Sequence, residues 1–258
     1  MSVRALIVGP GEPAMSIQGT PFIDLQEIGV QAVYETLPVK FYKIENLTHR
    51  VIIGMANRVQ DKAKLERITR VAGSDQETWD SSEQEAIGCM VAKKQMGRAE
   101  EWILSRFIKK RGMGVFRNVT GISANTFTSI SHSTKAVVVS FSDIPAGIDH
   151  EVIEVRGTGW ARKMDPGGDV ARIMEFLSAW QRPSAPEAET MTWAAKEAAL
   201  KAWGIAKTGL VPRVRISGHE GQVVARLVTD AGDERGCTIL LRSIEGCVLA
   251  LALYEEAG

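Results

Sequence analysis

Three carboxylates and a lysine are spaced so that a fold can bring them together. Asp149 and Glu151 are two residues apart in a short apolar stretch, and alternate residues of a β-strand point to the same face. Glu197 and Lys201 are four residues apart in a run with helical character, so they share one flank with Trp193. A hard cation such as Mg²⁺ is held by one or two carboxylates together with substrate phosphates, and lysine supplies a mobile positive charge. This set predicts metal-assisted attack on a phosphoanhydride.

Each of these residues also has an ordinary structural interpretation. An isolated Asp-x-Glu is most often the solvent face of an edge strand, and an i, i+4 pair of Glu and Lys contributes only about 0.2 to 0.5 kcal/mol. His150 and Glu154 fall on the opposite strand face from the two acids, so we interpret His150 as structural and Glu154 as a lesser ligand candidate. A functional site is favoured because the acidic pair and the helical pair occur in one chain, with a Trp four residues before Glu197.

Three blocks follow one another along the chain: Ser129-Ile130-Ser131-His132-Ser133 before an apolar run, Gly147-Ile148-Asp149-His150-Glu151, and Trp193-x-x-Lys196-Glu197-x-x-x-Lys201. In this order they resemble the signature of the 4'-phosphopantetheinyl transferase superfamily. The match covers roughly residues 127 to 210 and is similar to the long, single-chain type related to the surfactin-synthetase activating enzyme. The resemblance implies transfer of 4'-phosphopantetheine from coenzyme A to a serine of an apo acyl or peptidyl carrier protein, with release of adenosine 3',5'-bisphosphate.

The resemblance also implies roles for the acidic residues and the lysine. Asp149, Glu151 and Glu197 would hold Mg²⁺ against the pyrophosphate. Glu197, or Glu151, would accept the proton of the attacking serine, and Lys201 would contact a phosphate oxygen. The catalytic set is therefore expected to be Glu197, Lys201 and Glu151.

A second set is expected to bind coenzyme A. By the resemblance, His132 contacts the 3'-phosphate with help from Ser131 or Ser133. Arg106 and Lys110 lie in a stretch similar to the family's Arg-rich helix and are candidates for the same phosphate pocket. A Ser–His catalytic pair is disfavoured, because adjacent strand residues point to opposite faces and no Gly-x-Ser-x-Gly elbow is present.

Composition indicates an ordinary globular protein without a membrane or nucleic-acid partner. Hydrophobic residues make up 45% and charged residues 24% of the 258 residues, and the formal net charge is zero. No apolar run approaches the roughly 20 residues of a membrane span, and residues 1–10 lack the pattern of a signal peptide, so we expect a cytoplasmic protein. Three cysteines without Cys-x-x-Cys spacing disfavour a disulfide framework or a zinc site.

Blocks of strands and helices predict an α+β fold. Ser82 with Glu85 fits a capping box, Gly97 is expected to break the helical run, and Gly112 and Gly114 to end it. Predicted helices cover residues 61–71, 82–110, 170–180 and 192–203. Predicted strands cover residues 3–8, 49–55, 127–130, 136–141, 147–155, 211–216, 223–228, 238–241 and 248–254. The resemblance implies two similar halves, residues 1–143 and 144–258, related by a pseudo-twofold with the active site in the cleft between them.

Partners and rival functions follow from the same resemblance. An acidic carrier domain would meet a basic rim, for which Lys201, Lys207 and Arg213 are candidates. A monomer would be sufficient. A non-catalytic relative that binds coenzyme A or carrier protein, and a metal-dependent phosphohydrolase in which water replaces the serine, remain alternatives.

Overall fold

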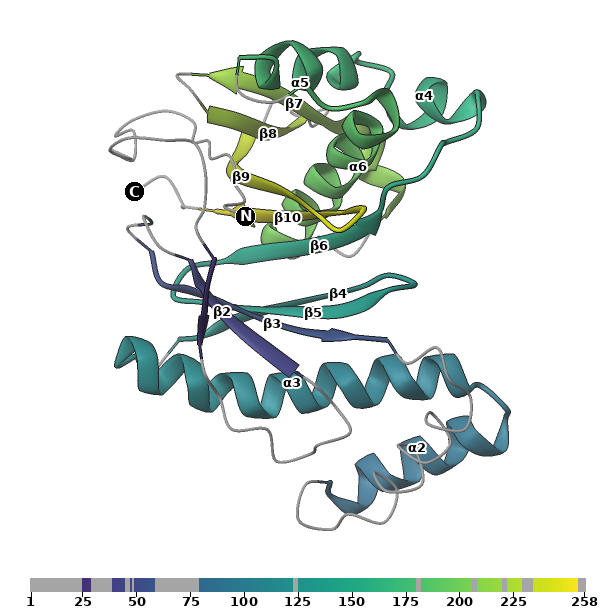
Figure 1. Ribbon diagram of the computed structural model, residues 1–258, viewed down its shortest axis with the longest axis vertical. Helices are drawn as coiled ribbons and strands as arrows, with labels where there is room; N and C mark the ends of the chain where they lie inside the picture. Colours follow the sequence, from purple (N-terminus) through teal and green to yellow (C-terminus); the bar gives the residue numbers. More distant parts are fainter. Residues whose placement is uncertain are drawn as a thin grey trace.

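Two five-stranded antiparallel sheets lie face to face, and helices cover the outer side of each (Figure 1). The computed structural model describes residues 25–28, 39–44, 47, 49–58, 79–122, 125–179, 182–205, 208–219, 222–228 and 234–254. The predicted strand at residues 3–8, the predicted helix at residues 61–71 and the rim candidate Lys207 lie outside these ranges. The α+β class predicted from the sequence is confirmed.

The first sheet is built from the N-terminal half of the chain and the second from the C-terminal half. In spatial order the first sheet contains β1 (Leu25–Ile28), β2 (Val39–Ile44), β3 (Val51–Asn57), β5 (Ala136–Ser142) and β4 (Phe127–His132). The second contains β6 (Ala146–Val152), β10 (Cys247–Leu253), β9 (Glu234–Ile244), β8 (Gln222–Val228) and β7 (Val214–His219). The predicted boundary after residue 143 falls in the connection from β5 to β6, which are strands of different sheets.

The helices occupy the two outer layers. Within the described ranges they are α2 (Ser81–Ala92), α3 (Met96–Thr120), α4 (Gly159–Met164), α5 (Asp169–Leu177) and α6 (Ala185–Ala202), with a 3₁₀ helix η1 (Thr208–Arg213). Helix α3 packs on β3 and β5, and α6 packs on β6 and β10. In the N-terminal half the long helix α3 comes after β3, the third described strand of its sheet. In the C-terminal half the long helix α6 comes after β6, the first strand of its sheet, so the two halves differ in element order. The pseudo-twofold stays a prediction.

Among the residues that the structure describes, three apolar clusters hold the four layers together. One lies between α6 and the second sheet, and another between α3 and the first sheet. The third lies between the sheets, where Ile53 and Val138 of the first meet Ile148, Leu249 and Leu251 of the second. Because both sheet faces are covered, strands β5 and β10 are buried at every position, which explains their continuous apolar sequences.

Several predicted helix ends are wrong, and packing explains one of them. Helix α3 continues to Thr120 through Gly112 and Gly114, where an end was expected. A Cβ on Gly112 would lie 2.1 Å from the Phe141 ring, so this glycine permits close contact between helix and sheet and does not break the helix. The break before α3 falls at residues 93–95 and not at Gly97.

The helix caps also differ from the predicted ones. The capping box of α2 is formed by Asp80 and Glu83 in place of Ser82 and Glu85. Helix α6 begins at Ala185, seven residues before the predicted start, behind a capping box of Ser184 and Glu187. Its Pro186 lies in the first turn, where a missing N–H costs no helical hydrogen bond.

The strand predictions are closer to the structure. Each described predicted strand overlaps an observed one, although residues 208–213 form η1 before β7 begins at Val214. Strand β6 ends at Val152, earlier than expected, and the short helix α4 lies in a stretch for which neither helix nor strand was predicted beyond residue 155.

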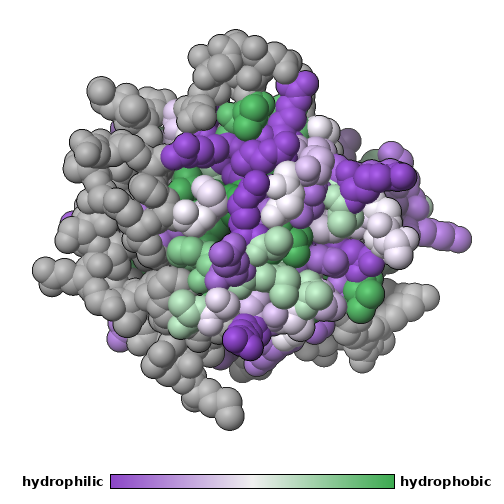
Figure 2. All heavy atoms as spheres, turned by 90° about the horizontal axis from the view of Figure 1, so that it is seen from above, coloured by the Kyte–Doolittle hydropathy of each residue, from purple (hydrophilic) through white to green (hydrophobic). Residues whose placement is uncertain are grey.

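The outer face above α5 carries mixed side chains. Exposed Arg172 and Glu175 flank Met174, which is 36% exposed. Figure 2 shows hydrophilic side chains running between separate apolar spots on this face. Among the described residues no helix is long and apolar enough to cross a membrane.

Candidate functional site

Edge strand β6 brings together the residues that were predicted to do chemistry. Lys201 of α6 donates to Asp149 Oδ1 at 2.7 Å and to the Ile148 carbonyl at 3.0 Å. Ser131 of β4 donates to the same Oδ1 at 2.8 Å. Asp149 is 4% exposed, so its charge lies in a mostly dry environment between two sheets and a helix. The predicted alternation of β6 and the i, i+4 geometry of α6 are both found.

Close approach of α6 to β6 depends on small residues. Alanines at positions 194, 195, 198 and 199 are buried against the second sheet. A Cβ on Gly147 would lie 1.9 Å from the Ala198 carbonyl oxygen and 2.5 Å from the Ala202 nitrogen. Backbone atoms cannot move aside as a flexible side chain can, so glycine at 147 sets how near Lys201 comes to Asp149.

Serine hydroxyls of β4 accept hydrogen bonds from backbone N–H groups at the free edge of β6. Ser129 Oγ accepts from the Ile148 N–H at 3.0 Å, and Ser131 Oγ accepts from the His150 N–H at 3.1 Å. An edge strand otherwise leaves such donors unpaired, and burial of an unpaired N–H is costly. Ser131 therefore has two roles: it closes the sheet edge and it donates to Asp149.

Glu151 is held from the helix side. Trp193 Nε1 donates to Glu151 Oε1 at 3.0 Å, and Arg156 Nη2 lies 4.0 Å from Oε2. Burial, followed by the charge of Asp149, raises the pKa of the Glu151 carboxyl. Both oxygens of this predicted ligand already have contacts within the protein.

Glu197 is the least engaged carboxylate of the site. Its Oε1 is buried and has no hydrogen-bond partner among the described residues. Burial raises the pKa of the Glu197 carboxyl, and the charge of Asp149 adds to this effect, while Lys201 opposes it. A carboxylate with a raised pKa is a stronger base than an ordinary Glu.

Asp149 and Glu197 fit a divalent cation. Asp149 Oδ2, like Glu197 Oε1, is buried without a hydrogen-bond partner in the part of the chain that the structure describes. Buried polar atoms are nearly always satisfied in native proteins, so two such oxygens at one site are suited to ligate an ion. No described group of three His, Cys, Asp or Glu side chains forms a ready-made metal cluster. Two carboxylates are nevertheless what Mg²⁺ commonly uses beside substrate phosphates.

The two histidines of this region lie on different faces. His150 is 4% exposed and its Nδ1 lies 2.9 Å from Ser133 Oγ, in agreement with the structural role predicted for it. Burial lowers the pKa of the His150 ring. The side chain of His132 is 58% exposed and its Nε2 lies 3.5 Å from Glu101 Oε2 of α3, on the other side of β4 from Asp149. His132 is thus near the acidic site along the chain but does not contact it.

The structure places Arg106 and Lys110 away from the acidic site. Both lie on the side of α3 that faces α2, where Arg106 stacks on Trp102 and Lys110 pairs with Glu83 and lies over the Trp79 ring. The first sheet separates these cations from α6 (Figure 1). A coenzyme A phosphate at Lys110 would be far from a metal at Asp149.

Some residues that shape the site were not singled out from the sequence. Lys196, although part of the Trp-x-x-Lys-Glu motif, is 1% exposed and pairs with Asp169 at 2.7 Å, so it anchors α6 to α5. Arg156 contacts Glu151, and Ser129 contacts β6. The alternating serines at 129, 131 and 133 were a visible signal for an edge contact. The motif marked Lys196 but not its buried pairing with Asp169, and nothing in the sequence marked Arg156.

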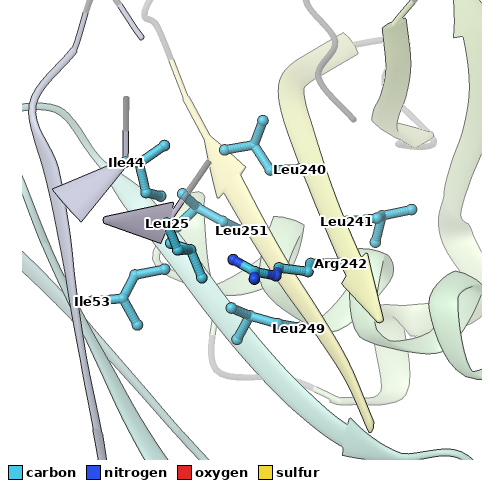
Figure 3. A pocket seen from close by; sticks show the side chains of 8 residues that line it. All are labelled: Leu25, Ile44, Ile53, Leu240, Leu241, Arg242, Leu249 and Leu251. Carbon is cyan, nitrogen blue, oxygen red and sulfur yellow. The ribbon is translucent and has the colours of Figure 1, made fainter. Parts of the chain in front are cut away.

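A pocket between the sheets is chemically different from this site. Figure 3 shows its lining, which is aliphatic apart from the Arg242 side chain. It is lined by Leu25, Ile44, Ile53, Leu240, Leu241, Arg242, Leu249 and Leu251. None of these residues belongs to the predicted catalytic or cofactor-binding sets.

Comparison with known proteins adds no relative to this picture. A scan of protein-family models gave no match to the chain, and a search of curated proteins gave none either. Fold and site geometry therefore carry the functional argument.

Proposed function

We propose that the protein is a Mg²⁺-dependent 4'-phosphopantetheinyl transferase that modifies a serine of an apo acyl or peptidyl carrier protein in the cytoplasm. One observation carries the proposal: Lys201 pairs with Asp149 at a place where Asp149 Oδ2 and Glu197 Oε1 are buried without hydrogen-bond partners. Two carboxylates with a lysine suit the pyrophosphate of coenzyme A and its bound cation.

Asp149 and Glu197 would hold the ion, which when bound would neutralise charge at the pyrophosphate and polarise the attacked phosphorus. Glu151, the third proposed ligand, would approach the ion from its place beside Trp193. Lys201 uses two of its three N–H groups on Asp149 and Ile148, which leaves the third for a phosphate oxygen.

Proton transfer is assigned to Glu197. Its raised pKa favours acceptance of the proton from the carrier serine, directly or through one water. Ser131, which donates to Asp149, would orient that carboxylate. His132, exposed at the end of β4, would bind the 3'-phosphate of coenzyme A.

The position of Arg106 and Lys110 favours a second candidate function. If these cations do not bind coenzyme A, the N-terminal half makes fewer contacts with it. The alternative is then a non-catalytic relative that binds coenzyme A or a carrier protein.

Intact-mass analysis of carrier proteins tests the proposal. The purified protein is incubated with coenzyme A, Mg²⁺ and a panel of apo carriers, with a Ser→Ala carrier as the control. A phosphopantetheine adduct that is lost with EDTA and with the control carrier is expected. Bound coenzyme A beside an unmodified carrier would indicate the non-catalytic relative, and hydrolysed coenzyme A alone would indicate a phosphohydrolase.

A further inference from the structure

Arg156 lies against two indole rings next to the acidic site. Its guanidinium carbon lies 5.1 Å from the centroid of Trp160 and 5.5 Å from that of Trp193. The two rings are 6.4 Å apart and tilted by 60°. The Arg156 side chain is 11% exposed, so this cation is largely desolvated, where a cation–π contact stabilises by about 2 kcal/mol.

Two residues of this cluster, Trp193 and Arg156, also contact Glu151. The Trp193 ring that faces Arg156 is the ring whose N–H donates to Glu151 Oε1 at 3.0 Å. Arg156 itself approaches the other oxygen, Oε2, at 4.0 Å. Each oxygen of Glu151 is therefore contacted by one residue of the cluster. Arg156 comes from the β6–α4 connection, Trp160 from α4 and Trp193 from α6.

Ring contacts and charge, more than hydrogen bonds, hold the guanidinium in place. Arg156 Nε and Nη2 are buried and have no hydrogen-bond acceptor among the described residues. A buried arginine normally forms several hydrogen bonds with its fork of donors. Contacts with two indole rings take their place, and a delocalised guanidinium packs on aromatic rings in a way that the ammonium of lysine does not reproduce.

We propose that Arg156 is a positioning residue of the acidic site, which fixes the Glu151 carboxylate for metal binding through its contact with the Trp193 ring and through its own charge. The inference rests on the metal site of the proposed function. Residues behind a metal ligand orient it, and their loss costs about 10- to 100-fold in metal affinity.

Calorimetric titration of the full-length protein with Mn²⁺ alone tests this role. Arg156→Ala is expected to weaken binding by about 10- to 100-fold, and Arg156→Lys by less. Trp193→Phe, which removes only the indole N–H and part of the ring, should also weaken binding. The double variant Arg156→Ala/Trp193→Phe should be little worse than Arg156→Ala, since both act on Glu151. Arg162→Ala, on the exposed side of α4, is the matched control and should bind like the wild type.

The outcomes separate this inference from the proposed function. A folded Arg156→Ala protein with wild-type Mn²⁺ affinity would overturn it, even if its thermal stability were reduced. If Arg156→Ala does not fold, wild-type affinity of both Arg156→Lys and Trp193→Phe would overturn it equally. Metal binding that depends on Arg156, in a protein that modifies no carrier, would support the inference and refute the transferase. A wild-type protein that binds no Mn²⁺ would remove both the inference and the metal site.

Discussion

The ammonium of Lys201 lies 2.7 Å from Asp149 Oδ1, and this contact joins helix α6 to strand β6. It pairs one charge from the acidic strand with one from the Trp-x-x-Lys-Glu helix, two blocks that are 52 residues apart in sequence. Because Asp149 is buried, the pair is screened less than a surface salt bridge.

Glu197→Gln should abolish carrier modification while leaving the fold intact. The amide keeps the shape of the side chain but can neither accept the serine proton nor offer an anionic ligand, and loss of a general base typically costs about 10²- to 10⁴-fold. The rate of adduct formation at saturating coenzyme A is the measurement. Glu189→Gln on the same helix is the control, and a folded Glu197→Gln protein with the wild-type rate would exclude the assigned role.

Gly147→Ala should destabilise the protein by about 2 kcal/mol or more, because the new Cβ meets backbone atoms of α6. Urea denaturation followed by circular dichroism measures the free energy of unfolding. Gly114→Ala, where a Cβ meets nothing within 4 Å in an exposed part of α3, should be neutral or slightly stabilising. Equal stability of the Gly147→Ala variant and the wild type would mean that α6 does not approach β6 so closely.

Ser131→Ala should cost about 1 to 3 kcal/mol of stability, since it leaves both the His150 N–H and one Asp149 contact unsatisfied in a buried setting. Ser178→Ala, which removes an exposed hydroxyl bound to a helix carbonyl, should have little effect. Both are compared by urea denaturation. An equal, small loss for the two variants would show that the serine hydroxyls of β4 do not stabilise the sheet edge.

Stability should fall in mild acid because His150 is buried neutral. Ser133 Oγ accepts from the Lys135 and Ala136 N–H groups, so its own proton is donated to His150 Nδ1, and the ring carries its proton on Nε2. Burial lowers the folded-state pKa of His150, and Lys135 adds to this while Asp149 opposes it. The unfolded chain therefore binds more protons just below the ordinary histidine pKa of about 6.5.

The resulting contribution to stability is fully present above that pKa and is lost as the pH falls towards the folded-state value, by at most about 1.4 kcal/mol per pH unit. The free energy of unfolding, measured in EDTA between about pH 7.5 and 5.5, should fall more steeply for the wild type than for His150→Gln. Identical slopes for His150→Gln and the wild type would contradict this assignment.

Lys196→Met should lower the stability of the protein, and any loss of carrier modification should follow from that lower stability. Lys196 and Asp169 form a buried pair, and removal of one partner typically costs about 3 to 5 kcal/mol. Lys163→Met on the exposed side of α4 is the control in thermal denaturation. A Lys196→Met protein of normal stability that fails to modify its carrier would instead place Lys196 in the catalytic set.

Periodicity alone determined the α+β class, most strands, and the two local geometries of the site. Asp149 and Glu151 share a strand face and Glu197 and Lys201 share a helix flank because these relations depend only on backbone repeat. Contacts between distant segments were decided by the tertiary structure. Gly112 continues a helix because Phe141 of another element fills the space beside it, and Lys196 is buried because Asp169 folds over α6.

The same distinction between local pattern and tertiary contact applies to the residues expected to bind coenzyme A and the metal. Spacing placed Arg106 and Lys110 on one helical flank, but that flank faces α2, since the opposite one carries the apolar side chains that pack on the first sheet. The partnership of Arg156 with Glu151 likewise arises only when Trp160 and Trp193 come together from different helices. A local pattern specifies which residues share a face, whereas the burial of apolar surface across the whole chain decides what that face meets.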